Sequence, residues 1–259
     1  MQIIFMFNYS LFKKILTNRK LRKNSFIKNE IALRLLKRLD FIKLFPEKIL
    51  VVGYTDNDYI KNLKARFPNA DILLEDDEGS IFNIIISNST IHLTDNISEE
   101  LNNYYQKLDN DGILLFSTFG DKSFLSINKA FKEIDDLPHT NKMIDILTWG
   151  NLLQNSIYKN PAIESDKITL TYENHSTLFE DLRALNEPLA DNKMHICLTG
   201  KNRWNKFLKK LYENLQLEIE ALYGYAIKKQ DDKNLSPRKN SNRISLEELK
   251  KQITEFKKD

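Results

Sequence analysis

The 259-residue chain contains only one cysteine, Cys197. A single cysteine cannot form an intrachain disulfide, and it excludes zinc sites built from pairs of cysteines. His139, His175 and His195 show no spacing typical of metal ligands, so the sequence predicts no metal site. A chain without disulfides is typical of a reducing compartment, and we expect this protein in the cytoplasm.

Long hydrophobic runs and a large excess of one charge are also missing. The apolar segment 1–7 is too short for a membrane span or a signal-peptide core, so we expect no membrane span. The 39 basic and 36 acidic side chains give a formal net charge of +3, which makes no general case for binding DNA. Basic residues do gather at 13–23 and 236–243, either as solvated surface or as contact segments.

Strand and helix patterns alternate through the first half of the chain. The apolar run Lys48–Gly53 is typical of a parallel strand buried on both faces. Strands are further predicted at 71–76, 81–88 and 113–120, and helices at 57–67 and 98–108, the latter capped by Ser98. A turn is predicted at 109–112, with Gly112 supplying a positive φ. This order predicts right-handed crossovers and a doubly wound sheet.

The second half carries two strands that alternate in polarity, at 166–174 and 217–229, separated by helices. We expect these late strands to form an antiparallel edge, and we expect a helix capped by Ser176 between them. The N-terminal apolar stripe predicts two helices broken near Asn24. The overall prediction is an α/β, Rossmann-like three-layer sandwich with a mostly parallel sheet, an antiparallel last strand, extra N-terminal helices and a short C-terminal helix.

The predicted domain spans residues 1–229 and includes the N-terminal helices at 9–45. Residues 230–242 are polar and rich in helix breakers, which predicts a flexible linker. A short helix capped by Ser245 should follow, so that residues 230–259 form a linker and a C-terminal helix.

Ligands of open doubly wound sheets bind beyond the carboxyl ends of the strands. This rule selects the strand ends 53–58, 75–77, 87–92 and 118–121. Within them we take six residues as candidates for binding a cofactor: Gly53, Glu75, Asp76, Ser87, Asn88 and His92. An acidic residue that closes the second strand can bind ribose hydroxyls, and Glu75 or Asp76 occupies that place. The alternatives are an exposed acidic loop and a structural histidine. We expect a bulky residue at position 53 to block binding at little cost in stability. No residue is assigned a catalytic role.

Several segments resemble one family. These are "FIKNEIALRLLKRLDFIKLFPEKILVVG", "FNIIISNSTIHLTDN", "LDNDGILLFSTFG", "ITLTYENHSTLFEDLRALNE" and the tail "SPRKNSNRISLEEL". Over nearly the whole chain they resemble class I S-adenosylmethionine-dependent methyltransferases. The branch is the one with the malonyl-carrier-protein methyltransferase of biotin synthesis and the relatives of the complex I assembly arginine hydroxylase. The Asn186-Glu187 pair, where the assembly-factor group shows Gly-Glu, and the tail favour its alphaproteobacterial members.

The resemblance implies S-adenosylmethionine as cofactor and an acyl-carrier-protein or respiratory-complex protein as partner. The sequence departs from the family at the expected site. Tyr54 and Thr55 replace the glycine-rich loop, and Leu93 replaces the family's tryptophan. Between Gly53 and Ile81 there is room for one helix and one strand, where the family fits two such units. We therefore predict a degraded cofactor site. Methyl transfer and a non-catalytic role as an assembly factor that binds proteins both remain open.

Overall fold

The computed structural model describes residues 7–41, 44–77, 79–194 and 199–229. The strands are β1 (Lys48–Gly53), β2 (Asp71–Leu73), β3 (Phe82–Asn88), β4 (Leu108–Phe119), β5 (Lys159–Thr171) and β6 (Gln216–Ile227). The helices are α1 (Tyr9–Thr17), α2 (Phe26–Arg38), the 3₁₀ turn η1 (Leu39–Phe41), α3 (Asn57–Arg66), α4 (Ile97–Lys107), α5 (Leu125–Lys132), α6 (Ile146–Gln154), α7 (His175–Ala184) and α8 (Lys201–Tyr212).

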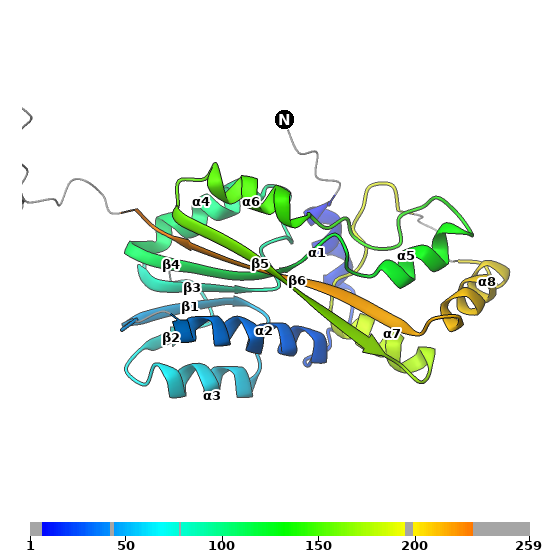
Figure 1. Ribbon diagram of the computed structural model, residues 1–259, viewed down its shortest axis with the longest axis horizontal. Helices are drawn as coiled ribbons and strands as arrows, with labels where there is room; N and C mark the ends of the chain where they lie inside the picture. The colour runs from blue at the N-terminus through cyan, green and yellow to red at the C-terminus, as the bar shows by residue number, and fades with distance from the viewer. Residues whose placement is uncertain (1–6, 42–43, 78, 195–198, 230–259) are drawn as a thin grey trace, which may run out of the picture. The chain divides into compact units, whose positions relative to one another are not determined.

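The six strands form one sheet in the order β2-β1-β3-β4-β6-β5 (Figure 1). β1 to β4 pair in parallel, and β6 runs antiparallel to both β4 and β5. The predicted parallel sheet with β1 in its interior and two antiparallel late strands is confirmed. β6 lies beside β4 rather than beside β1, so the antiparallel pair extends the sheet on the side far from β2.

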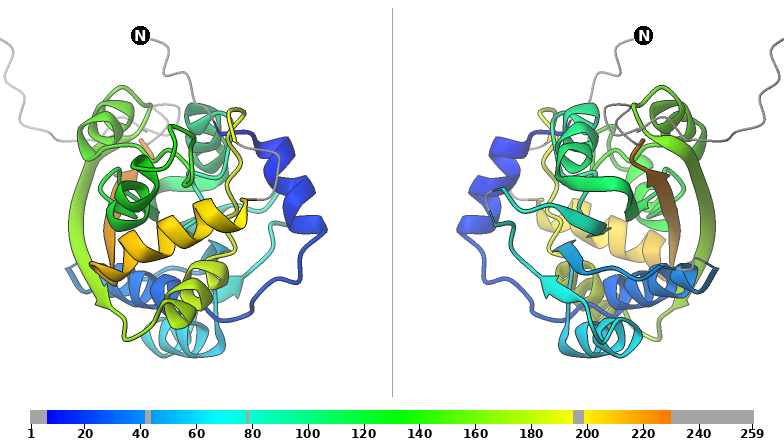
Figure 2. Two further views of the ribbon diagram at one scale, coloured as in Figure 1. Left: turned by 90° about the vertical axis from the view of Figure 1, so that its right-hand side faces the viewer. Right: turned by 90° about the vertical axis from the view of Figure 1, so that its left-hand side faces the viewer.

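Helices cover both faces of the sheet, which gives the predicted three layers (Figures 1 and 2). Alternate side chains of β1 pack on opposite faces of the sheet: Ile49 and Val51 belong to one core cluster and Leu50 to the other. The first cluster includes side chains of α2, α3, α5, α7 and α8, and the second includes side chains of α4 and α6. A continuous apolar strand is therefore needed at this position, as the sequence predicted.

Local capping chemistry sets where the helices begin. Ser25 caps α2 by accepting from the Lys28 N–H, which confirms the predicted break between α1 and α2. The predicted caps at Ser98 and Ser176 are wrong. Asn96 caps α4 and Asn174 caps α7, because an asparagine with the same capping ability stands two residues earlier in each case.

The predicted role of Gly112 is also wrong. Residues 109–112 are part of β4, and Asp111, with φ +57°, is the residue in the left-handed region. A Cβ at position 112 would lie 2.7 Å from the Asp109 carbonyl oxygen, so glycine is needed there for space.

Between β1 and β3 the described chain contains one helix, α3, and one strand, β2, as the sequence spacing predicted. β2 forms the edge of the sheet. The chain then returns through residues 74–81 to the start of β3. No helix of the described residues is long and apolar enough to cross a membrane. The predicted linker and C-terminal helix at 230–259 lie outside the described residues, and the domain boundary stays a prediction.

Candidate functional site at the carboxyl ends of the strands

Gly53 ends β1 at the place where the sequence predicted a ligand. Its φ of +89° lies in the region that favours glycine. A Cβ here would collide with the Asn88 carbonyl oxygen and lie 2.8 Å from the Thr90 methyl group. The expectation that a bulky residue costs little stability at position 53 is therefore wrong, because the neighbouring strand leaves no room for a side chain.

The loop after Gly53 is bonded to the end of β3. The Tyr54 N–H donates to the Asn88 carbonyl at 3.0 Å, and the Asn88 side-chain amide donates back to the Tyr54 carbonyl at 3.1 Å. The Tyr54 hydroxyl accepts from the Ser25 N–H at 3.3 Å, which joins the loop to the start of α2. Asp56 then caps α3. The N–H and the carbonyl of Tyr54 are thus both bonded to Asn88.

Ser87 and Asn88 are both 0% exposed, and so is Thr118 on the neighbouring strand β4. Ser87 Oγ, Asn88 Oδ1 and Thr118 Oγ1 find no hydrogen-bond partner among the described residues. Unpaired buried oxygens are costly, and they commonly mark places that hold water or a ligand. Any ligand that reached these oxygens would have to displace the residues that cover them.

His92 follows β3 and belongs to a buried charged trio. Its Nε2 lies 3.2 Å from Glu187 Oε2, and Lys28 Nζ lies 2.6 Å from Glu187 Oε1. The Lys28 and Glu187 side chains are only 9% and 4% exposed. The His92 ring packs edge-on against Phe119 at the end of β4, with ring centroids 5.7 Å apart. His92 Nδ1 has no hydrogen-bond partner within the part of the chain that the structure describes.

The two neighbours determine the protonation state of the Glu187 carboxylate. Burial raises the pKa of Glu187, whereas Lys28 and His92 lower it. Their combined effect is larger than that of burial, so the pKa lies below its ordinary value. Glu187 is therefore ionised at neutral pH. The preceding residue, Asn186, has φ +53°, a conformation that asparagine tolerates better than most residues. This explains how asparagine can stand where the resembling family shows glycine.

Glu75 and Asp76 lie in the exposed loop after β2. Asp76 forms an ion pair with Lys107, the last residue of α4, directly before β4 begins. Because β4 begins beside the first residue of β3, this ion pair lies near the start of β3. Gly53 pairs with Asn88 at the other end of that strand. The ends of a seven-residue strand lie about 20 Å apart. The structure therefore brings Gly53 together with Asn88 but does not bring Asp76 to them.

Two further carboxylates lie at the carboxyl end of β4. Glu220 of β6 is buried, and it accepts from the Lys122 N–H at 3.1 Å and from Ser165 Oγ at 3.2 Å. Burial raises the pKa of Asp121, and the neighbouring Glu220 raises it further. Residues 118–121 were selected by the strand-end rule, but the contribution of Glu220 depends on a strand about 100 residues later.

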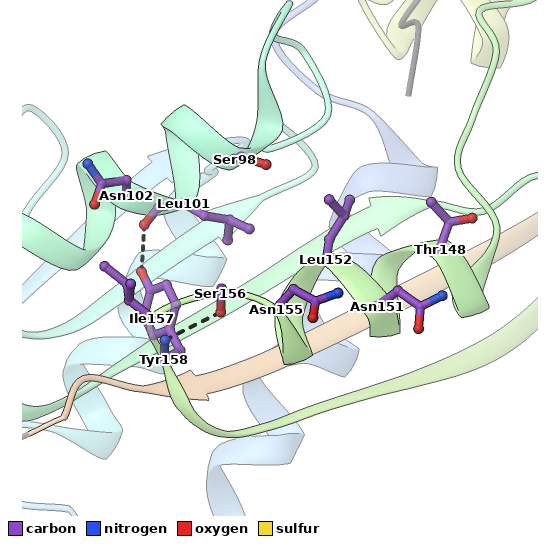
Figure 3. A pocket seen from close by; sticks show the side chains of 10 residues that line it. All are labelled: Ser98, Leu101, Asn102, Thr148, Asn151, Leu152, Asn155, Ser156, Ile157 and Tyr158. Atoms are coloured by element: carbon purple, nitrogen blue, oxygen red, sulfur yellow. Dashed lines mark hydrogen bonds between the residues drawn. The ribbon is translucent and has the colours of Figure 1, made fainter. Parts of the chain in front are cut away.

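A hollow of about 550 Å³ lies between α4 and α6 (Figure 3). Asn102 of α4, Asn151 of α6 and Asn155, which follows α6, are among the residues that line it. The Tyr158 hydroxyl donates to the Leu101 carbonyl at 2.9 Å. Burial raises the pKa of Tyr158 far above its ordinary value, so this hollow offers no acid or base that works near neutral pH. No group of three or more His, Cys, Asp or Glu within the described ranges could hold a metal ion.

Comparison with known proteins finds similar methyltransferases. No protein-family profile matches the sequence. The malonyl-acyl-carrier-protein O-methyltransferase of Nitrosospira multiformis is 25% identical over 254 residues, which cover 78% of this chain and 82% of that protein. The enzyme of the same name from Gallionella capsiferriformans is 22% identical over 247 residues, covering 79% and 85%. The chain is similar in sequence to these methyltransferases. This confirms the branch that the sequence resembles, while placement in its assembly-factor group stays a prediction.

Solved structures are also similar to this chain, at low levels. Phosphoethanolamine N-methyltransferase 2 of Haemonchus contortus, in complex with S-adenosyl-L-methionine, has a TM-score of 0.44 and 13% identity, covering 77% of this chain and 52% of that one. YcgJ of Bacillus subtilis has a TM-score of 0.43 and 8% identity, covering 86% and 100%. These scores carry no functional argument.

Sequence reasoning missed Lys28 entirely. It had noted Glu187 only as half of the Asn-Glu pair, without a role. A lysine at the third position of an apolar stripe gives a weak signal, since Lys28 interrupts the otherwise buried positions Ile27 and Ile31. Lys28 precedes His92 by 64 positions, and His92 precedes Glu187 by 95, so no local sequence pattern connects the three residues.

Proposed function

We propose that this protein is a relative of the malonyl-acyl-carrier-protein methyltransferases that no longer binds S-adenosylmethionine tightly and acts by binding a partner. The observation that carries the proposal is the hydrogen bonding of the turn after β1 to the end of β3. The Tyr54 N–H, a backbone amide where a cofactor would need free donors, is bonded to the Asn88 carbonyl, and the Tyr54 carbonyl accepts from the Asn88 side chain. The candidate side chains Ser87 and Asn88 are 0% exposed.

Two further features support the loss of the cofactor. The sheet ends at β2, a strand of three residues, so one edge offers little surface for an adenine ring. Asp76, the candidate ribose ligand, is paired with Lys107 at the far end of β3. The residues present do not fit the cofactor, and we derive no methyl-transfer step through it.

Calorimetric titration with S-adenosylmethionine and S-adenosylhomocysteine tests the proposal. We expect dissociation constants of about 1 mM or weaker, which is roughly −4 kcal/mol or less favourable. The Nitrosospira multiformis relative serves as the positive control under the same conditions. A micromolar dissociation constant for this chain would overturn the proposal and restore the enzymatic alternative.

The partner class follows from the relatives' names, which specify a malonyl-acyl-carrier protein. We propose a carrier protein as the partner and the cytoplasm as the place of action. The other candidate from the sequence, a respiratory-complex protein bound by an assembly factor, stays a prediction, because no contact or surface in the described residues favours it. A methyl-transfer assay on malonyl-acyl-carrier protein separates both binding roles from an active enzyme, and we expect no turnover.

A further inference from the structure

Two segments of the described chain contain basic but no acidic residues. Residues 9–25, which form α1 and the linker that follows it, contain six Lys and Arg residues and no Asp or Glu. The helix α8 contains five Lys and Arg residues and again no Asp or Glu. The whole chain has a net charge of only +3, so these two segments are far more basic than the rest of the protein.

The linker and α8 lie at the same end of the molecule. Leu21 of the linker and Trp204 of α8 line one hollow of about 490 Å³. Arg183, from the last turn of α7, lines the same hollow. The left view of Figure 2 looks at this end: α8 crosses its middle, and the blue linker runs along one side. We call the surface formed by residues 18–25, Arg183 and α8 the basic end.

Most cations of the basic end have no carboxylate paired with them. In α8, Arg203 pairs with Asp135, and Lys210 pairs with Glu133. The remaining cations of α8 and those of the linker are exposed and make no ion pair with a described residue: Lys201, Lys206, Lys209, Arg19, Lys20, Arg22 and Lys23. The surface therefore presents seven unpaired positive charges to a partner.

Apolar side chains are exposed among these cations. Leu21 of the linker is 52% exposed, and Trp204 and Tyr212 of α8 are 37% and 52% exposed. The other side of α8 is buried through Phe207 and Leu211, so only the outer side chains of this helix can meet a partner. Exposed apolar groups among unpaired cations favour a partner that is both anionic and partly apolar.

The surface of a membrane that contains anionic lipids matches both features. Trp and Tyr side chains are favoured at the level of the lipid head groups, and Lys and Arg side chains are attracted by the negative surface. Lipid head groups are mobile and can move towards each cation. Binding to them therefore does not require that the lysine and arginine side chains hold fixed positions.

A single-stranded nucleic acid is also a polyanion, but it matches this surface less well. Its bases stack on aromatic rings that are free to receive them. The Trp204 ring already packs against Phe179 and Phe207, with ring centroids 5.4 and 5.2 Å apart. Leu21, the exposed apolar residue of the linker, has no ring at all.

We propose that the basic end binds the surface of a membrane that contains anionic phospholipids. Lys201, Lys206 and Lys209 would lie near the lipid phosphates, and Trp204 and Tyr212 would lie among the head groups. Such binding is peripheral and depends on charge, so salt should weaken it. It goes beyond the proposed function and is independent of it, because neither the cofactor nor a carrier protein takes part.

Co-sedimentation with sucrose-loaded vesicles tests the proposal. Vesicles of phosphatidylcholine with about 30% phosphatidylglycerol should bind the protein at least about tenfold more tightly than vesicles of phosphatidylcholine alone. Raising the salt concentration from about 0.1 M to about 0.5 M should remove most of this difference, because salt screens the charges. Binding should shift the emission of Trp204 to shorter wavelengths, whereas Trp149, which is 0% exposed, should not respond. The Trp204→Phe variant should lose the shift and still sediment with the vesicles.

Charge variants locate the binding surface on the protein. The first variant removes the three unpaired cations of α8: Lys201→Gln, Lys206→Gln and Lys209→Gln. It should weaken binding to the anionic vesicles at least about tenfold. The matched control removes three exposed cations of α2, β1 and α3: Lys37→Gln, Lys48→Gln and Lys64→Gln. It lowers the net charge by the same amount and should change binding less than about twofold.

Three results would overturn the proposal. Equal binding to anionic and neutral vesicles would show that the cations do not drive the contact. Equal loss in the two triple variants, both with the circular dichroism of the wild type, would show that net charge rather than the basic end determines binding. Displacement of the protein from the vesicles by a single-stranded RNA oligonucleotide at the same phosphate concentration would assign the basic end to nucleic acid instead.

Discussion

Replacing Glu187 by glutamine should destabilise the protein strongly, because it leaves a buried cation without its counterion. The Lys28 side chain is only 9% exposed, and its Nζ lies 2.6 Å from the carboxylate. At an effective dielectric constant of about 20, two unit charges at that distance attract by roughly 6 kcal/mol. Desolvation offsets part of this attraction. Breaking a buried pair by removing one partner typically costs about 3–5 kcal/mol, and we expect a loss in this range.

Combining Lys28→Met with Glu187→Leu removes both charges, and it should restore most of the stability. The double-mutant cycle should then give a coupling of about 2 kcal/mol or more.

Urea unfolding measures these changes. Fluorescence of the buried Trp149 and far-ultraviolet circular dichroism should give coincident transitions before free energies are compared. Glu180→Gln, an exposed position on α7, is the matched control and should change stability by less than about 0.5 kcal/mol. A loss below about 1 kcal/mol for Glu187→Gln would show that Lys28 finds another partner or water, and it would refute the reasoning.

The same pair predicts how stability depends on pH. The pKa of Glu187 is lower in the folded protein than its ordinary value of 4.5. A carboxylate whose pKa is lowered by folding stabilises the protein above the unfolded pKa, and this stabilisation is lost as pH falls through the folded pKa. Wild type should therefore lose more stability than Glu187→Gln between about pH 5 and pH 3. Parallel pH profiles of the two proteins would contradict this.

Two other substitutions test backbone constraints through urea unfolding. Gly53→Ala should cost roughly 2 kcal/mol or more, because φ is positive and the new Cβ would collide with the Asn88 carbonyl; a neutral effect would show that β1 and β3 can separate here. Asn186→Gly should cost about 1 kcal/mol through the lost hydrogen bonds to Arg22, and Asn186→Val should cost about 1–2 kcal/mol more, because a β-branched residue tolerates φ +53° poorly. Equal losses in the two variants would show that the turn does not require this conformation.

Much of the fold could be predicted because its signals are local. The apolar runs of β1 and β3 identify strands buried on both faces, and the alternation in β6 identifies an antiparallel strand. Ser25 identifies the break between α1 and α2. The helix α5 was missed because its start carries no local cap: Phe124 stands there in the left-handed conformation, at φ +60°, and the Ser126 N–H donates instead to Glu218, a residue of β6 that lies 92 positions later.

The candidate site could be predicted only in part. The ends of neighbouring strands meet by topology, so Gly53 and Asn88 could be placed together from the strand-end rule. The position of Asp76 depends on a three-residue strand and on an ion pair with Lys107, and neither has a sequence signal. The charged trio joins α2 with two loops far apart in the chain, so it depends on the completed fold.

The same geometry explains why a glycine, Gly53, stands at the end of β1. A glycine at the end of a first strand is commonly taken as a trace of a ligand that approaches the backbone. Here the Asn88 carbonyl and the Thr90 side chain already occupy the space that a Cβ at position 53 would need. Folding alone therefore requires Gly53, and its presence gives no support to a bound cofactor. The proposed loss of the cofactor rests instead on Tyr54, whose N–H and carbonyl are both bonded to Asn88.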